Sequence, residues 1–357
     1  MKKTFSLVWS VICLCALLIG LVYIFFVAME TGTVNGVKML VGTILSFILA
    51  PTLHEMGHVI FAKASTMECQ YVKFFCFKFQ RKKGKMRFSF VSPFAPDETR
   101  VIPKNGNKMK NRVIAYTLGG LVLQGLTFFA LLLTVIWVGV LGRTSYLLLA
   151  MIPYMSYLFL MNVVPFEYPS GKTDCLVLLG IKQGWDVEKT MLSVFEIHGQ
   201  LYEGKSFSQI DKALYFNLPQ LSANEPLFSI VLDLRYRYYL EKNQIEQASD
   251  CLNRLTQAEG YLSEEEVEKI GAEFTYIHSL LGDWENAEAC GKICRKFLSS
   301  DSPTAKRVLA MYSKAFGDKQ AVPLLIAQAE EGLKLEPIEG FVKAERILLK
   351  RLQENQE

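Results

Sequence analysis

The sequence has 357 residues, of which 51% are hydrophobic, and a formal net charge of +4. The hydrophobic share is too high for an ordinary soluble enzyme, and so small a net charge gives no electrostatic reason to expect a nucleic-acid partner. The length allows two or three domains. The eight cysteines contain no CxxC pair, so we interpret them as reduced thiols rather than a disulfide framework.

Four hydrophobic runs are each long enough to cross a lipid bilayer, which takes about 20 apolar residues in a helix. They cover residues 5–29, 39–64, 113–141 and 145–166. The first run follows Lys2 and Lys3, but it is too long for a signal peptide and has no small-x-small cleavage site, so we expect it to be retained. A polar loop over residues 30–36 is expected to join the first two helices.

The distribution of lysine and arginine predicts the orientation of these helices. Lys2 and Lys3 precede the first run, and most of the remaining basic residues of the hydrophobic half lie between the second and third runs. The connections on the other side contain only Lys38 and Arg143. The positive-inside rule therefore places the N-terminus, residues 65–112 and the C-terminal tail in the cytoplasm.

Residues 69–93 change to the two-residue period of a β-strand. Tyr71, Lys73, Phe75, Phe77 and Phe79 alternate along one predicted strand, and a second strand has Met86, Phe88 and Phe90 in alternate positions. The basic, glycine-containing stretch 81–85 between them predicts a β-hairpin. This prediction puts aromatic residues on both faces of the hairpin. Such a hairpin could contact lipid or lie over a site in the membrane, and the alternative is an ordinary hairpin packed on the protein.

The chain becomes polar and almost wholly helical from about residue 184. A turn followed by alanine recurs at residues 240–248, 280–287 and 315–321, a spacing of roughly 34 to 40 residues that is typical of helical-hairpin repeats. This pattern resembles tetratricopeptide repeats, although only the turn is recognisable. Such arrays bind peptides or partner proteins along a concave face. The alternative is a plain helical domain without a ligand.

The sequence therefore predicts a mainly α protein with two domains. Residues 1–183 form a membrane-embedded domain with about four transmembrane helices and a β-hairpin, and residues 184–357 form a cytoplasmic all-α helical-repeat domain.

The second hydrophobic run contains the pattern His54-Glu55-Met56-Gly57-His58, which includes two of the four histidines in the chain. Histidines four residues apart share one face of a helix, so both imidazoles can reach one metal ion. A catalytic zinc ion takes three protein ligands and one water, whose pKa it lowers toward about 7. Glu55 would then accept the proton of that water. The alternative is a pair of structural histidines.

A third ligand must come from elsewhere in the sequence. Asn162-Val163-Val164-Pro165 ends the fourth hydrophobic run, and Asp174 follows it. An aspartate after a broken membrane helix can return to the depth of the histidines, but Asp174 could equally cap a helix that starts near Cys175.

Residues 39–180 resemble the site-2 protease family of intramembrane zinc metalloproteases. The resemblance rests on the His54–His58 motif, on Gly119-Gly120-Leu121-Val122-Leu123-Gln124, and on Asn162 to Pro165 followed by Asp174. It implies that His54, His58 and Asp174 bind one zinc ion per chain. It also implies that Glu55 is the catalytic base and that Asn162 hydrogen-bonds the substrate backbone or the oxyanion. The hairpin resembles the family's membrane-associated β-hairpin, which is thought to present unwound substrate by strand addition.

This sequence departs from the family pattern in three places. Cys175 follows Asp174 where the family commonly has glycine, and Gln124 stands where asparagine is more usual. The spacer between Pro165 and Asp174 is long and polar, and its Glu167 is the alternative third ligand.

The expected function is hydrolysis of a peptide bond in or near the membrane segment of a protein or peptide substrate, with the helical tail recruiting a protein partner. The alternative from another class is a catalytically inactive membrane scaffold that binds partners through its tail. A zinc-dependent transporter or maturation factor for a small peptide is a third reading. The resemblance and the few membrane segments imply a multi-pass protein of a bacterial cell membrane, in contact with the lipid bilayer and with no nucleic-acid partner.

Overall fold

The computed structural model describes residues 2–82, 85–93, 95, 97–141, 145–168, 171–257 and 262–354. The protein forms two compact units: the first is Met1–Ile102 with Lys108–Glu188, and the second is Pro103–Asn107 with Lys189–Glu357. The division runs through helix α6 (Asp186–Tyr202), just after the boundary between residues 183 and 184 that the sequence predicts.

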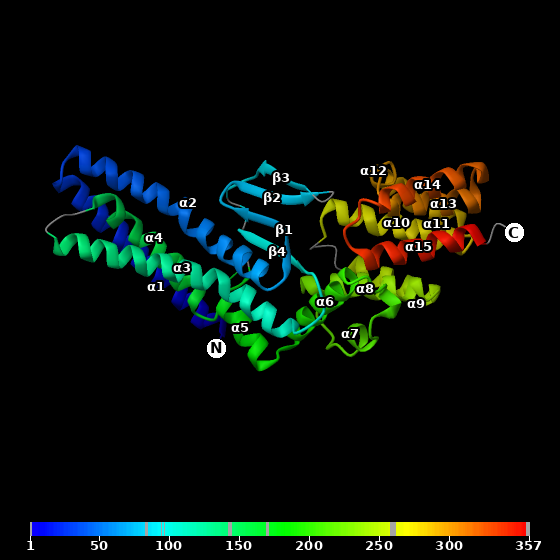
Figure 1. Ribbon diagram of the computed structural model, residues 1–357, viewed down its shortest axis with the longest axis horizontal. Helices are drawn as coiled ribbons and strands as arrows, with labels where there is room; N and C mark the ends of the chain where they lie inside the picture. Colours follow the sequence, from blue (N-terminus) through cyan, green and yellow to red (C-terminus); the bar gives the residue numbers. More distant parts are fainter. Residues whose placement is uncertain are drawn as a thin grey trace. The chain divides into compact units, whose positions relative to one another are not determined.

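The first unit contains four helices that are long and apolar enough to cross a membrane, as the hydrophobic runs predict. They are α1 (Lys2–Glu30), α2 (Thr33–Ala64), α3 (Met109–Val140) and α4 (Tyr146–Val163) (Figure 1). Their outer surfaces expose apolar side chains such as Phe25, Leu133 and Trp137, which suits contact with lipid. The predicted loop over residues 30–36 is too long, because Gly32, with φ of 84°, makes the turn and α2 begins at Thr33.

Glycines bring α2 close to its neighbours. A Cβ atom at Gly57 would come within 2.9 Å of the Cα atom of Gly120 on α3, and one at Gly42 would meet the backbone carbonyl of Leu147 on α4. Small residues at such contacts let membrane helices pack backbone to backbone. This packing places the middle of α3 directly beside the His54–His58 turn of α2.

A four-stranded sheet follows α2. Its strands are β1 (Met67–Phe74), β2 (Phe77–Lys82), β3 (Lys85–Phe90) and β4 (Glu98–Pro103), and its order is β3-β2-β1-β4 (Figure 1). The predicted hairpin is confirmed as β2 and β3, which pair antiparallel with Phe79 opposite Phe88. Its turn residues Lys83 and Gly84 lie outside the described residues.

The single alternating strand expected over residues 71–79 is wrong. Phe75, with φ of 51°, starts a two-residue turn, so Phe74 at the end of β1 pairs with Phe77 at the start of β2. A turn of this length reverses the chain and resets which side chains share a face.

The corrected register separates the two faces of the β2–β3 hairpin. Phe77, Phe79, Phe88 and Phe90 lie on one face, with ring centroids 5.2 Å apart for Phe79 and Phe88. The opposite face has basic and polar residues: Lys78, Gln80, Arg87 and Ser89. The expectation of aromatic residues on both faces is therefore wrong, and the hairpin is amphipathic.

The second unit consists of helices, three pairs of which meet at the turns that the sequence predicts. Left-handed residues shape two of these turns, Asn243 with φ of 59° and Gly282 with φ of 73°. After α6 come η1 (Phe207–Gln209), α7 (Ala213–Phe216), α8 (Pro226–Glu241), α9 (Ile245–Leu255), α10 (Glu264–Leu280), α11 (Trp284–Ile293), α12 (Arg295–Leu298), α13 (Pro303–Phe316), η3 (Lys319–Ala321), α14 (Val322–Leu333) and α15 (Glu339–Glu354).

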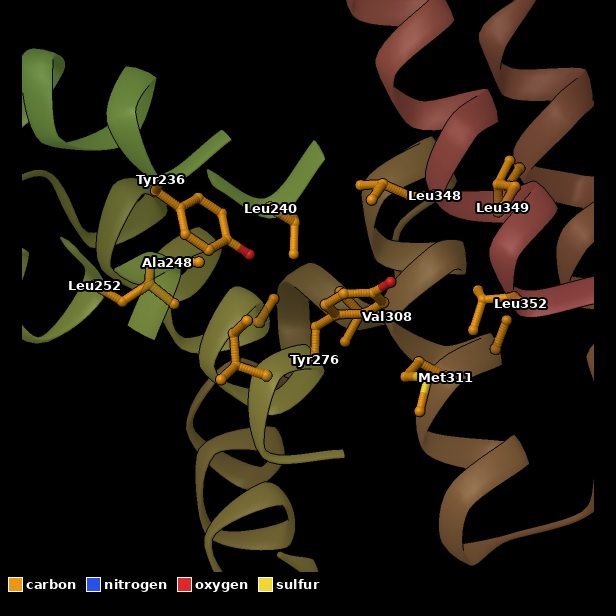
Figure 2. Close-up of a cluster of buried hydrophobic side chains, with 14 of the residues drawn as sticks. Tyr236, Leu240, Ala248, Leu252, Tyr276, Val308, Met311, Leu348, Leu349 and Leu352 are labelled. Carbon is orange, nitrogen blue, oxygen red and sulfur yellow. The ribbon is translucent and has the colours of Figure 1, made fainter. Parts of the chain in front are cut away.

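One large apolar core joins helices α8, α9, α10, α12, α13, α14 and α15, and Figure 2 shows part of it. Tyr236 and Leu240 from α8, Tyr276 from α10, and Val308 from α13 lie in it. Ala248 and Ala287, two of the three alanines of the turn pattern, are fully buried near the starts of α9 and α11, where their small side chains allow two helices to approach. Ala321, the third, is half-buried in η3, so the alanine marks a helix-packing contact in two of the three turns.

A buried charge network crosses this core. Arg307 on α13 donates from Nη2 to Glu273 Oε1 at 2.7 Å and from Nε to Glu345 Oε2 at 2.7 Å. Tyr236 donates to Glu273 Oε2 at 2.7 Å. Burial by itself would raise the pKa of Glu273, but the charges of Arg307 and Arg237 outweigh it and lower that pKa. The network therefore links α10, α13 and α15 through ion pairs and α8 through the hydroxyl of Tyr236.

Replacing Arg307 with methionine is expected to lower the free energy of unfolding by about 3 to 5 kcal/mol, because two buried carboxylates lose their cation. Arg346→Met is the matched control, since the ion pair of Arg346 with Glu330 is exposed and is worth about 1 kcal/mol or less. Urea denaturation of the full chain in detergent, followed by far-UV circular dichroism, measures both. Equal midpoints for the two variants would contradict a structural role for the network.

Candidate metal centre

Three side chains that could hold a metal ion meet in the first unit. His54 and His58 lie on α2, and Asp174 begins α5 (Asp174–Gln183). One potential ligand atom from each lies within 4.8 Å of the others, and both histidines are buried. The Nε2 atoms are 3.2 Å apart, and Asp174 Oδ2 lies 3.2 Å from that of His54 and 3.4 Å from that of His58.

The hydrogen bonds of the two imidazoles determine which nitrogen of each ring faces the centre. His54 Nδ1 lies 2.9 Å from Gln124 Oε1, and His58 Nδ1 lies 2.9 Å from the carbonyl oxygen of Tyr116. Both partners are acceptors, so each Nδ1 is the protonated donor and each neutral ring keeps its lone pair on Nε2. Metal-ligating histidines are usually oriented in this way by a second hydrogen bond.

The three groups fit a divalent metal ion. Two Nε2 lone pairs and a carboxylate oxygen repel one another unless a cation lies between them, and Asp174 Oδ2 is buried without a hydrogen bond from any described residue. A tetrahedral zinc ion with bonds of about 2.0 to 2.1 Å holds its ligand atoms roughly 3.3 to 3.4 Å apart. The separations of 3.2 to 3.4 Å match that spacing.

Thr173 brings Asp174 to the histidines. Its Oγ1 donates to Val164 O at 2.9 Å and accepts from Phe166 N at 3.2 Å, just after the end of α4. The same oxygen accepts from Leu176 N at 3.3 Å, which caps α5. Thr173, not Asp174, is therefore the cap of this helix, and the Asp174 side chain remains available to the centre.

The long spacer before Asp174 forms a small hairpin. Strands β5 (Glu167–Tyr168) and β6 (Gly171–Lys172) pair antiparallel, and Thr173 N donates to Phe166 O at 3.1 Å at their base. Because the hairpin closes on itself, its length does not move Asp174 away from α4. Glu167, the alternative ligand, is exposed on β5, and the described cluster contains Asp174 instead.

An aspartate is ordinarily ionised at neutral pH, and the carboxylate is the form that binds a metal ion.

The predicted residues Asn162 and Gln124 have different surroundings. Asn162 is buried, and its Nδ2 donates at 3.2 Å to Leu158 O of its own helix. No contact recorded among the described residues joins it to the three ligands. Gln124 is fully buried and bonds His54, while its Nε2 has no hydrogen-bond partner among the described residues. Gln124 thus orients an imidazole, a role that the sequence does not reveal.

Thr99 is a further residue of the site that sequence reasoning missed. It lies on β4 and donates from Oγ1 to Glu55 Oε2 at 2.5 Å, with both side chains buried. Tyr116 donates from its hydroxyl to Thr99 O at 2.6 Å, and the Tyr116 backbone accepts from His58. The sheet therefore holds the glutamate directly, and it reaches the second histidine through Tyr116 on α3.

A buried lysine fixes the segment that leads into β4. Lys73 on β1 is 1% exposed and donates to Asp97 Oδ1 at 2.9 Å and to the carbonyl of Ala95. The backbone N–H of Phe75 donates to the same carboxylate oxygen at 2.8 Å. These bonds tie β4 to β1 and so position Thr99 for Glu55.

Because Gly120 on α3 has no side chain, it leaves room for the imidazoles of His54 and His58. A Cβ atom there would come within 2.8 Å of His54 Cε1 and would also fall against the His58 ring. The glycine-rich stretch of α3 therefore serves both helix packing, through Gly119, and the shape of the centre.

Replacing Thr99 with valine is expected to slow any reaction that uses Glu55 by about tenfold, because a hydrogen bond to a charged group contributes about 1.5 to 3 kcal/mol. Thr99→Ser keeps the hydroxyl and is expected to retain the activity. Metal content should be unchanged in both variants, since Thr99 contacts the glutamate and no ligand side chain. Loss of activity in the serine variant as well would point to a packing role instead.

No protein-family model, curated protein or solved structure matches this chain.

Proposed function

We propose that the chain is an intramembrane zinc metalloprotease that hydrolyses a peptide bond in or near the membrane segment of a protein or peptide. The observation that supports this most strongly is the convergence of two imidazole lone pairs and a buried carboxylate oxygen at separations of 3.2 to 3.4 Å. Glu55, one residue from the first ligand, is the general base that such a centre requires.

In this proposal His54, His58 and Asp174 hold the zinc ion. The ion, when bound, polarises the peptide carbonyl and lowers the pKa of a water molecule toward about 7. Glu55 accepts a proton from the water while the water oxygen forms a bond to the carbonyl carbon. When the carbon–nitrogen bond breaks, Glu55 passes that proton to the leaving nitrogen. Thr99 holds Glu55 Oε2 in place through these steps.

Asn162 is proposed to hydrogen-bond the substrate backbone or the oxyanion. Its Nδ2 now bonds the last turn of its own helix at 3.2 Å, so it must exchange that partner for substrate. Such an exchange is local, because it needs a change of side-chain rotamer and no movement of α4.

The amphipathic β2–β3 hairpin is proposed to present substrate. Its outer strand β3 is exposed along its whole length, so its free edge can accept an extended peptide by strand addition. The exposed Phe88 and Phe90 suit a position in the membrane interface. This edge lies on the opposite side of the sheet from β4, whose Thr99 bonds Glu55.

The remaining features belong to the same proposal. The N-terminus and the second unit are proposed to lie in the cytoplasm, on the side where lysine and arginine are concentrated, and the resemblance is the ground for proposing a bacterial cell. The helix pairs of the second unit are proposed to be tetratricopeptide-like repeats that bind a protein partner.

The experiment that tests the proposal compares membrane proteomes of cells that express wild-type protein or Glu55→Gln. A protease leaves at least one full-length membrane protein or peptide accumulating in the variant, with its cleaved fragment present only in the wild type. Identical proteomes at matched expression would reject proteolysis and favour the inactive scaffold.

A further inference from the structure

The second unit contains a cavity of about 390 Å³ that the proposed reaction does not use. Its volume lies in the range of about 300 to 1,000 Å³ that is typical of ligand sites. Side chains from α8, α9, α10, α12, α13 and α15 line it, together with the segments before α10, α13 and α15. It therefore lies between helices that are far apart in the sequence.

Large apolar side chains form much of the cavity wall. They come from both ends of the unit and include Leu252, Leu255, Leu262, Ile270, Phe297 and Phe341. An apolar ligand group that enters the cavity is thus removed from water, which contributes about 25 cal/mol for each Å² buried.

Most charged groups of the wall already have partners. Asp233 accepts from Arg237 Nε at 2.9 Å, and Glu273 is paired with the buried Arg307. Lys269 lies 2.8 Å from Glu265, which does not line the cavity. These pairs leave no surplus positive charge at the wall.

Two carboxylates of the wall lack a cation. Glu266 accepts hydrogen bonds from the N–H and hydroxyl of Ser263, and Glu336 accepts one from Ile338 N at 3.4 Å. Neither has a lysine, arginine or histidine within ion-pair distance among the described residues. Burial raises the pKa of Glu336, which shows that its negative charge is poorly solvated and would gain from a cation.

We propose that this cavity binds a peptide segment in which lysine or arginine residues alternate with large apolar residues. The basic groups contact Glu266 and Glu336, and the apolar side chains fill the wall between them. A peptide suits the site better than a small amine because the two carboxylates come from separate elements, the first turn of α10 and the segment before α15. One peptide chain carries both kinds of group, so a single ligand can reach the two carboxylates and the apolar wall together.

The natural source of such a segment is the cytoplasmic flank of a membrane helix. Lysine and arginine are concentrated there, next to the apolar residues that enter the bilayer. This assignment of source rests on the cytoplasmic orientation of the proposed function. The cavity would then recruit a membrane protein by the part of its chain that lies just outside the lipid.

The test measures binding to the full chain in detergent by fluorescence anisotropy. The probe is a short labelled peptide of alternating lysine and leucine, and the comparison peptide has glutamate in place of lysine. Binding to empty micelles is subtracted. Only the lysine peptide is expected to bind, more weakly at high salt because ion pairs are screened. Equal binding of the glutamate peptide would overturn the proposal.

Variants locate the binding. Glu266→Gln and Glu336→Gln keep the side-chain shape, and each is expected to weaken binding of the lysine peptide by about tenfold. Glu246→Gln, on the exposed face of α9 and outside the cavity, is the matched control and should bind as the wild type does. Wild-type affinity in both cavity variants would overturn the assignment.

The Glu55→Gln variant separates this inference from the proposed protease. It should bind the lysine peptide as tightly as the wild type, because Glu55 lies in the other unit. Peptide binding without any proteolysis in cells would reject the protease and leave the cavity site. Proteolysis in cells, together with unchanged peptide binding by the cavity variants, would support the protease and reject the cavity site.

Discussion

Asp174→Ala is expected to lose nearly all of the zinc that the wild-type protein retains, which should be about one ion per chain. The variant removes the only carboxylate that lies with the two histidines in the described cluster. Loss of a residue that merely orients a ligand costs about 10- to 100-fold in metal affinity, so loss of a ligand should cost at least as much. Zinc content of detergent-purified protein, prepared without chelators, measures the effect.

Two further variants make the zinc measurement specific. Asp174→Asn keeps the size of the side chain and removes its charge, so it should also bind zinc far more weakly. Glu167→Ala is the control, because Glu167 is exposed on the β5–β6 hairpin and should leave zinc content unchanged. Loss of zinc from Glu167→Ala with full retention in Asp174→Ala would show that the third ligand has been assigned to the wrong acid.

Glu55→Gln is expected to slow peptide hydrolysis by about 10² to 10⁴, the usual contribution of a general acid–base residue. It should retain zinc, because Glu55 bonds Thr99 and is not among the three clustered ligands. The glutamine oxygen can still accept from Thr99, so the fold should be preserved while the proton acceptor is lost. Initial cleavage rates of a substrate found by the proteome comparison, in detergent or liposomes, measure the effect.

Glu30→Gln is the matched control for this variant, since Glu30 is an exposed glutamate at the end of α1. It should cleave at the wild-type rate. Cleavage by Glu55→Gln at the same rate would remove Glu55 from the reaction, whatever the zinc content.

The membrane helices and the first two ligands follow from local pattern. Twenty or more consecutive apolar residues satisfy the bilayer only as a helix, so length and composition alone predict α1 to α4. His54 and His58 are four residues apart on such a helix, and the helical repeat places both imidazoles on one face of it. No tertiary information is needed for either result.

The faces of the sheet could not be predicted in the same way. Alternation fixes which residues share a face only while the strand continues, and the turn at Phe75 breaks it. Glycine or asparagine usually marks a left-handed turn, and this turn has neither. Phenylalanine in a left-handed conformation is uncommon, so Phe75 gives no signal of the turn in the sequence. Because the turn at Phe75 shifts the alternation of side chains, the hairpin has one aromatic face and one basic and polar face instead of the two aromatic faces expected.

The sequence by itself thus determined the four membrane-length helices, the histidine pair and the adjacent glutamate, because each depends on the composition of, or the spacing within, a single helix. Only the tertiary structure decided the partners that come from distant segments. Thr173 closes a hairpin that returns Asp174 to the centre, β4 brings Thr99 to Glu55, and α3 brings Gln124 to His54. Such contacts depend on how helices and strands pack in space, and the residues between them in the sequence give no periodic signal of that packing.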